Sequence, residues 1–343
     1  MQQNQNSTQS ADKPKVAVIV TGGTILSTYN PETKQIKLDK TGEQLLSELP
    51  ALRDRYSIEL IEFSNIPSPH FTPQIILELV DKIEEMIFRP DICGVVVLQG
   101  TDTLEEVSYL CYLLTKADKP VVFTGSMKSM HELYADSLGN LYGAFFVAAS
   151  EQARNRGVMV YFNQNILSPR YVVKTNANNV ASFQAPETGP MGAVANEQIY
   201  FYHPHANQTH YGRSENITAN VQLIKASFNA DDLLLRACID RRVDGIVIEG
   251  LGAGNVPPSF IPAIQEAIEL KIPVVVVSRC IGGFAATAYD YHGGGAHLKR
   301  LGVISGQNLG GVRARLKLMV LLSINNDLEY IKQEFNENEC EDG

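Results

Sequence analysis

Two stretches decide the fold, KVAVIVTGGT (15–24) and GVVVLQGTDT (94–103). Each begins with a continuous apolar run of the length of a buried strand, and each run ends at glycine and hydroxyl-bearing residues. Glycine readily adopts the positive φ angles of tight turns, so the polar ends are expected to be loops. The two stretches therefore predict two buried strands, each followed at its carboxyl end by a polar, glycine-containing loop.

The same alternation of strand and helix continues around these stretches. Further strands are expected over SIELIE (57–62), VVFT (121–124) and VMVYF (158–162). Helices are expected over 103–115 and 137–149, and after Thr72-Pro73, which is typical of an N-cap followed by proline at the first helical position. Strands that alternate with helices pair in parallel through crossover connections. The expected fold class is therefore α/β, with a doubly wound parallel-type sheet in a larger N-terminal domain.

A second, smaller unit is expected after a break in this rhythm. The polar stretch FYHPHANQTHYGRSEN (201–216) has lost the strand–helix alternation. Beyond it, helices 231–241, 258–269 and 308–323 alternate with strands GIVIEG (245–250) and VVVVS (274–278), and a charged tail follows. The 343 residues also exceed the roughly 250–300 at which one core stops growing. The predicted division is a disordered tail (1–14), an N-terminal catalytic α/β domain (15–202), a linker (203–219) and a smaller C-terminal α/β domain (220–343).

The composition of the chain limits which classes of binding partner and which cellular compartment we expect. The 29 basic and 38 acidic side chains give a net charge of −9, which argues against nucleic acid as a partner because phosphate backbones attract basic surfaces. The five cysteines form no C-x-x-C pair, and the first fourteen residues lack the apolar segment of a signal peptide. No apolar run approaches the roughly 20 residues that span a bilayer. We therefore expect a cytoplasmic protein that binds neither nucleic acid nor membrane.

Three histidines of the polar stretch, His203, His205 and His210, are the candidate metal ligands. No carboxylate or cysteine stands at ligand spacing beside them. We therefore expect a solvated linker there and no metal site.

Three polar segments that follow strands carry the candidate chemistry: TGGT (21–24), QGTDT (99–103) and VKTN (173–176). In a doubly wound sheet, ligands bind at the carboxyl ends of the strands near the switch point, so the three segments are expected to meet in one crevice. Each segment also has a purely structural interpretation. These are a glycine turn, a helix N-cap at Asp102 or Thr103, and an ordinary surface lysine at Lys174.

Together, the three segments contain what the hydrolysis of an amide requires. A threonine hydroxyl needs a base or a polarising cation beside it before it attacks a carbonyl carbon. A lysine in a partly desolvated crevice loses its proton more easily and can act as that base. A nearby carboxylate can hold both the lysine and a substrate ammonium. Glycines beside the nucleophile leave backbone N–H groups free to stabilise a developing oxyanion.

The chain also resembles the bacterial-type L-asparaginases (the asparaginase/glutaminase family), from about Lys15 to the last expected helix. VIVTGGTI (18–25) is similar to the first signature of that family, and GVVVLQGTDTLEE (94–106) to the second. The other matching segments are KPVVFTGSM (119–127), ADSLGNLYGA (135–144), NRGVMVYFN (155–163), VVKTNANNVASF (172–183) and GLGAGNVP (250–257).

This resemblance implies roles for individual residues. Thr24 would be the nucleophile, with Tyr29 hydrogen-bonded to it from the following loop, and Thr101, Asp102 and Lys174 would be the supporting catalytic group. The implied substrate-binding positions are Ser68, Gly100, Thr101, Asp102, Ser126 and Asn255.

The resemblance also implies how the substrate is held and how the chain assembles. Asp102 would bind the α-ammonium of the substrate and Ser68 its α-carboxylate. Asn255 would reach into the active site of a neighbouring subunit. The implied assembly is therefore a homo-oligomer, either a dimer or a dimer of dimers (a homotetramer).

Several positions depart from the family pattern. Leu26 and Gln99 replace a small residue and a histidine, and neither change removes a reacting group. Residues 68–71 read SPHF, where the family has serine, a polar residue, aspartate and methionine, so this departure concerns substrate affinity rather than reaction type.

A further departure concerns the allosteric asparagine site that cytoplasmic members often have. Glu249 and Val173 stand where those relatives have arginine and threonine, whereas Cys280 matches a cysteine there. Because the arginine that would pair with a carboxylate is lost, we expect no effector site of that kind.

The implied activity is that of an L-asparaginase, which hydrolyses the side-chain amide of L-asparagine to L-aspartate and ammonia without a metal or organic cofactor. One alternative is glutamine as a comparable substrate, because one methylene contributes only about 1–3 kcal/mol of discrimination. A second is a transamidosome-type subunit that releases ammonia to a partner enzyme, although such subunits usually carry an extra N-terminal domain. A third is an inactive asparagine-binding module, which would need a damaged nucleophile or base.

Overall fold

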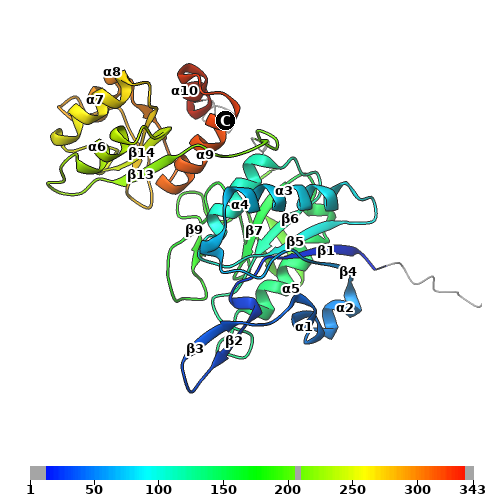
Figure 1. Ribbon diagram of the computed structural model, residues 1–343. Coiled ribbons are helices and arrows are strands. Elements are labelled where there is room, and N and C mark those ends of the chain that lie inside the picture. The colour runs from blue at the N-terminus through cyan, green and yellow to red at the C-terminus, as the bar shows by residue number, and fades with distance from the viewer. Residues whose placement is uncertain (1–12, 205–209, 337–343) are drawn as a thin grey trace, which may run out of the picture.

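The computed structural model describes residues 13–204 and 210–336, which form two α/β units (Figure 1). The N-terminal unit contains an 8-stranded sheet, and the C-terminal unit contains a 4-stranded sheet. The predicted fold class is therefore confirmed. The expected disordered tail (1–14), apart from its last two residues, lies outside the described residues, as does His205.

The switch point of the larger sheet lies between β1 (Lys15–Val20) and β5 (Gly94–Leu98). The chain places β4 (Ser57–Glu62) on one side of β1, and then β5, β6 (Val121–Thr124) and β7 (Val158–Phe162) on the other. All five strands are parallel and have the predicted bounds. Ligands of doubly wound sheets bind at the carboxyl ends of the strands that flank the switch point, and TGGT and QGTDT follow these two strands.

Beyond β7 the sheet continues with antiparallel strands, which the sequence did not predict. They are β8 (Asn165–Leu167), β11 (Gly192–Ala195) and β12 (Gln198–Phe201). Each has only three or four residues, which is too short for a period-2 pattern to be recognised. The complete order is β12-β11-β8-β7-β6-β5-β1-β4.

Helices cover both faces of this sheet. Ala17 and Ile19 of β1 share a core with α3 (Pro73–Phe88) and α4 (Leu104–Leu114). Val16, Val18 and Val20 share the opposite core with α1 (Gly42–Ser47), α2 (Pro50–Arg55) and α5 (Ser137–Ala148). Successive residues of a strand point to opposite faces, so the unbroken apolar run of β1 contributes to both cores.

The predicted start of α3 is confirmed. Thr72 is the N-cap, its hydroxyl accepts the Ile75 N–H at 3.3 Å, and Pro73 occupies the first helical position.

The C-terminal unit is a parallel sheet ordered β13-β14-β15-β16. The predicted strands are β14 (Gly245–Gly250) and β15 (Val274–Ser278), and the edge strands β13 (Val221–Lys225) and β16 (Ile304–Ser305) were not predicted. Its helices are α6 (Leu233–Asp240), α7 (Ile261–Glu269), α8 (Gly295–Leu301) and α9 (Gly311–Ile324). The expected helix 258–269 begins as a short 3-10 turn, Pro258–Phe260, before α7.

The last helix, α10 (Leu328–Asn336), stands where a charged tail was expected, and that expectation was wrong. Ile331 and Phe335 are buried although the residues between them are polar. Their spacing of four places both on one helical face, and this face joins the core that α9 also enters.

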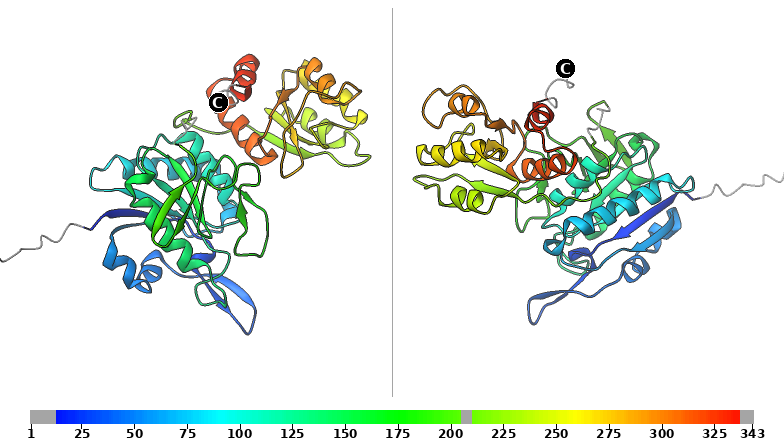
Figure 2. Two further views of the ribbon diagram at one scale, coloured as in Figure 1. Left: turned by 180° about the vertical axis from the view of Figure 1, so that it is seen from behind. Right: turned by 45° about the horizontal axis from the view of Figure 1, so that its top comes forward.

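The two units are joined by helix packing. α4 of the N-terminal unit packs against α9 of the C-terminal unit (Figure 2). Buried apolar residues of both units belong to one continuous core. α4 is the helix that follows the QGTDT loop, so this packing brings the C-terminal unit close to the candidate chemistry. Among the described helices, none is long and apolar enough to cross a membrane.

Candidate active site

The TGGT and QGTDT loops are joined at their first residues. The Thr21 N–H donates to the Leu98 carbonyl at 3.0 Å. The Thr21 hydroxyl lies 2.8 Å from the same carbonyl and 2.6 Å from Gln99 Oε1. β1 and β5 therefore stay paired up to the point where the two polar loops begin.

The two glycines of TGGT allow the loops to touch. Gly22 and Gly23 have φ angles of 127° and 99°, in the region that favours glycine. A Cβ added to Gly23 would lie 2.6 Å from the Gly100 Cα, and one added to Gly22 would lie 2.4 Å from the Ile66 carbonyl oxygen. The turn interpretation of these glycines is therefore correct, and Thr24 follows directly on the glycine that contacts the QGTDT loop.

Ser68 lies against Gly100, the residue of the QGTDT loop that Gly23 also contacts. A Cβ at Gly100 would be 2.8 Å from both Cβ and Oγ of Ser68, which is itself buried. Thr103 is the N-cap residue of α4, but it makes no side-chain cap hydrogen bond. Its hydroxyl donates instead to the Ser68 carbonyl at 3.0 Å, so the residue expected to cap the helix fixes Ser68.

Lys174 brings the third segment into the same place. Its Nζ donates to Thr101 Oγ1 at 3.0 Å and to Asp102 Oδ1 at 2.7 Å, across 73 and 72 residues of sequence. The Lys174 side chain is 16% exposed, whereas that of Asp102 is 67% exposed. An ordinary surface lysine does not fit this environment, and Asp102 keeps a solvent-facing carboxylate that a ligand can reach.

The loop after β6 forms a further wall of the site. A Cβ on Gly125 would lie 2.4 Å from the Gln99 carbonyl oxygen and 3.5 Å from Thr101 Cγ2. Ser126 follows and is 1% exposed, and its hydroxyl has no hydrogen-bond partner within the described residues. A buried hydroxyl without a partner retains an unused donor and acceptor next to Thr101.

Asp136 and Asn140 support this wall, and sequence reasoning missed both. The Asp136 carboxylate accepts the Met127 N–H, and Asn140 Nδ2 donates to the Gly125 carbonyl at 3.0 Å. Burial raises the pKa of Asp136, although these N–H donors lower it. Both residues lie in ADSLGNLYGA (135–144), a segment that was matched without a role.

Tyr29 and Asn255 lie outside this cluster in the single chain. Tyr29 is on β2 (Ser27–Asn30), which pairs with β3 (Gln35–Leu38) in a projecting hairpin (Figure 1). It is 38% exposed, and no hydrogen bond of the described chain joins it to Thr24. Asn255 belongs to the C-terminal unit, where its Oδ1 accepts the Gly295 N–H at 3.3 Å, the first residue of α8.

Three positions correspond to the effector site of cytoplasmic relatives, namely Val173, Glu249 and Cys280. Val173 and Cys280 line one cavity of about 20 Å³, which is the size of a single water. Glu249 does not line that cavity, and its Oε2 lies 3.2 Å from Lys225 Nζ.

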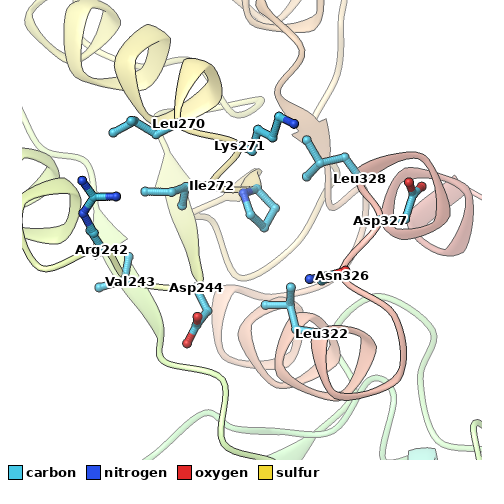
Figure 3. Close-up of a pocket in the computed structure, with 11 residues that line it drawn as sticks. Arg242, Val243, Asp244, Leu270, Lys271, Ile272, Leu322, Asn326, Asp327 and Leu328 are labelled. Atoms are coloured by element: carbon cyan, nitrogen blue, oxygen red, sulfur yellow. The ribbon is translucent and has the colours of Figure 1, made fainter.

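A larger cavity, of about 630 Å³, lies away from this chemistry (Figure 3). Arg242, Val243 and Asp244 line it just before β14, and Lys271 lines it just before β15. It is therefore at the amino ends of the C-terminal strands, whereas ligands of doubly wound sheets bind at the carboxyl ends. Among the described residues, no cluster of three or more His, Cys, Asp or Glu side chains is placed to hold a metal ion.

The arrangement at the carboxyl ends of β1, β5 and β6 has the parts of an acyl-transfer site. It combines a threonine beside a glycine turn, a partly buried lysine that touches a hydroxyl, and an accessible carboxylate. A pair of a lysine and a hydroxyl can take up the proton of an attacking hydroxyl, and backbone N–H groups at the turn can donate hydrogen bonds to the developing oxyanion.

Comparison with known proteins agrees with this arrangement. A family model described as asparaginase, N-terminal, matches residues 15–207, and one for the glutaminase/asparaginase C-terminal domain matches residues 220–335. An L-asparaginase from Bacillus licheniformis is 33% identical over 309 residues, which cover 90% of this chain and 95% of that protein. L-asparaginase 2 from Escherichia coli (strain K12) is 33% identical over 331 residues, which cover 94% and 93%.

A solved structure extends the similarity to three dimensions. The crystal structure of a probable cytoplasmic L-asparaginase from Campylobacter jejuni matches with a TM-score of 0.84 and 31% identity, covering 94% of this chain and 99% of the other. Because family models and relatives match both units, the chain belongs to the asparaginase/glutaminase family.

Proposed function

We propose that the chain is an L-asparaginase, an amidohydrolase that converts L-asparagine to L-aspartate and ammonia, with Thr24 as its nucleophile. The observation that carries the proposal is the position of Lys174 Nζ, 3.0 Å from Thr101 Oγ1 and 2.7 Å from Asp102 Oδ1. Family membership supports the reaction, and this geometry supports the assignment of the base.

In the first half of the reaction, Thr24 Oγ attacks the carbon of the substrate's side-chain amide. The Thr24 proton is taken up by the Thr101–Lys174 pair, and the oxyanion is stabilised by backbone N–H groups of the glycine turn. The C–N bond then breaks, the leaving nitrogen takes a proton, and ammonia departs. The product is a β-aspartyl ester on Thr24.

In the second half, water attacks the ester carbon and gives up its proton through Thr101 and Lys174. The ester bond breaks, Thr24 recovers its proton, and aspartate leaves. The same lysine therefore serves as base in both steps, which requires a neutral amine at the moment of attack.

Substrate recognition follows from the groups that surround Thr101. The solvent-facing carboxylate of Asp102 is suited to the α-ammonium of the substrate. Ser68 is suited to the α-carboxylate, and it lies against Gly100. The unpaired hydroxyl of Ser126 is available for a further hydrogen bond to substrate.

We further propose that the protein is cytoplasmic and acts as a homo-oligomer, either a dimer or a dimer of dimers. The odd number of cysteines, five, argues against a disulfide framework and supports a reducing compartment. Asn255 supports an oligomer because it lies in the C-terminal unit on a turn between Leu251 and Asn255, apart from the cluster of its own chain.

An ammonia-release assay with Thr24→Ala beside the parent tests the proposal. The parent should release ammonia from asparagine, whereas Thr24→Ala should bind asparagine in calorimetry and release none. Near-parental kcat in Thr24→Ala would refute the nucleophile. Glutamine belongs in the same assay, because the matching C-terminal model describes glutaminases as well as asparaginases.

A further inference from the structure

The backbone around Lys174 receives little support from strand pairing. β9 consists of Val173 and Lys174, and it pairs with β10 (Phe183–Gln184) in a two-stranded sheet separate from the large one. An isolated two-stranded pairing is marginally stable at best. Nevertheless, Lys174 Nζ must reach two acceptors within 3.0 Å. Contacts outside the strand must therefore hold this segment in place.

Glu105 provides one of these contacts. Its Oε2 accepts the Lys174 N–H at 3.3 Å, across 69 residues of sequence. Glu105 is the second residue of α4, so it follows closely on Thr101 and Asp102. One short segment of chain therefore makes three contacts with Lys174, two at the ammonium group and one at the backbone N–H.

Arg313 provides the second contact, from the C-terminal unit. Its Nη1 donates to the Val172 carbonyl at 2.6 Å, across 141 residues of sequence. Arg313 is the third residue of α9, and a cation in the first turn of a helix opposes the helix dipole. The stability of α9 therefore does not explain why this guanidinium is buried at this position.

Glu105 and Arg313 also face each other. Their closest N–O distance is 3.7 Å, and their side chains are 19% and 10% exposed. Burial raises the pKa of Glu105, and Arg313 and the Lys174 N–H oppose that rise. Burial lowers the pKa of Arg313, and Glu105 opposes that fall. Removing either partner would take away the opposite charge that faces the other side chain in this largely desolvated place, so we treat the two side chains as one unit.

We propose that Glu105 and Arg313 form a positioning pair. Glu105 holds residues 172–174 from the N-terminal unit and Arg313 holds them from the C-terminal unit, and together they set the distance between Lys174 Nζ and Thr101 Oγ1. Neither side chain touches the reacting atoms in this proposal. It rests on the proposed function, because Lys174 is taken as the base. Its consequence is that the N-terminal unit, although it carries the catalytic loops, depends on α9 of the same chain for the position of its base.

Steady-state kinetics on asparagine test the pair. Glu105→Ala should lower kcat by about 10- to 100-fold, because a misplacement of about 1 Å can cost that much in rate. KM should change less than kcat, since the substrate-binding groups stay in place. Glu105→Gln keeps an oxygen acceptor for the Lys174 N–H and should retain more activity than Glu105→Ala. Arg313→Met should resemble Glu105→Ala, and Arg313→Lys should recover part of the loss.

Glu106→Ala is the matched control. Glu106 is the next residue on α4 and also has a partly buried carboxylate whose pKa is raised by burial, but no hydrogen bond of the described chain joins it to residues 172–174. It should keep kcat near the parental value. The double variant Glu105→Ala/Arg313→Met should have a kcat no lower than that of the less active single variant, because the two residues act as one unit.

Hydrogen exchange of the peptide that contains residues 172–176 gives a readout that does not need activity. Glu105→Ala and Arg313→Met should both speed exchange in this peptide under native conditions, and Glu106→Ala should not. All variants are compared well below their lowest melting temperature, so that global unfolding does not contribute.

The outcomes separate this proposal from the proposed function. A parent that releases no ammonia would refute the function, while the exchange of residues 172–176 would still decide whether the pair holds the segment. Unchanged exchange in both variants would overturn the pair. If Glu105→Ala and Arg313→Met had lower melting temperatures but parental kcat, the pair would have a structural role only, and the positioning proposal would also be overturned.

Discussion

Replacement of Gly23 by alanine should inactivate the protein through the backbone alone. The change adds a single methyl group next to the proposed nucleophile Thr24, at a residue whose φ is 99°. The new Cβ would lie 2.6 Å from the Gly100 Cα and 2.8 Å from the Gly100 nitrogen, whereas ordinary van der Waals contact begins at 3.4 Å. Both obstructing atoms belong to the backbone, so the clash cannot be relieved by the rotation of a side chain.

The expected size of the effect follows from these distances. Relief of the clash requires the TGGT and QGTDT loops to separate by roughly 1 Å, and a displacement of that size can cost about 100-fold in rate. The unfavourable φ adds about 1–3 kcal/mol of strain to the folded state. We therefore expect kcat to fall by about two orders of magnitude and the free energy of unfolding to fall by about 1–3 kcal/mol.

The measurement is ammonia release together with urea unfolding, with Gly139→Ala as the control. Gly139 lies within α5, and a Cβ there would meet nothing within 4 Å. Alanine is about 1 kcal/mol more favourable than glycine inside a helix, so the control should be active and slightly more stable. Parental kcat in Gly23→Ala would refute the claim that close contact of the two loops positions Thr24.

Three further predictions address the base, the assembly and the last helix. Lys174→Met should lower kcat by several orders of magnitude with a smaller change in KM, and a variant altered only in melting temperature would contradict the role of base. Mixing inactive Thr24→Ala with inactive Asn255→Asp should restore part of the activity if neighbouring subunits share sites, and no recovery after confirmed subunit exchange would count against sharing. Phe335→Ala should lower the free energy of unfolding by about 3–5 kcal/mol because a large buried side chain is lost, whereas Glu329→Ala, at an exposed position of the same helix, should change it by less than about 0.5 kcal/mol in urea unfolding.

The sequence by itself determined the parallel strands other than β13 and β16, and the loops that follow those strands. β1, β4, β5, β14 and β15 have the predicted bounds, because five or six consecutive residues form a pattern that local chemistry alone can specify. The positions of TGGT and QGTDT at the ends of β1 and β5 follow from those bounds. Parallel pairing then places both loops at one edge of the sheet.

The tertiary structure alone decided the elements with no local signal and the partners that meet across the chain. β8, β11 and β12 are too short to show a period, and α10 has only two buried apolar residues, Ile331 and Phe335, among charged neighbours. Their stability comes from packing against elements that are distant in sequence.

For Lys174, too, the sequence indicates one part of its environment and the tertiary structure decides the rest. The motif indicates that a lysine stands near the site, but its low exposure and its contacts with Thr101 and Asp102 arise only after β9 has been placed beside α4. The contacts of Glu105 and Arg313 with residues 172–174 depend in addition on the docking of α9 against α4. No local pattern encodes such contacts, because burial and charge pairing are properties of the packed interface and of both segments together.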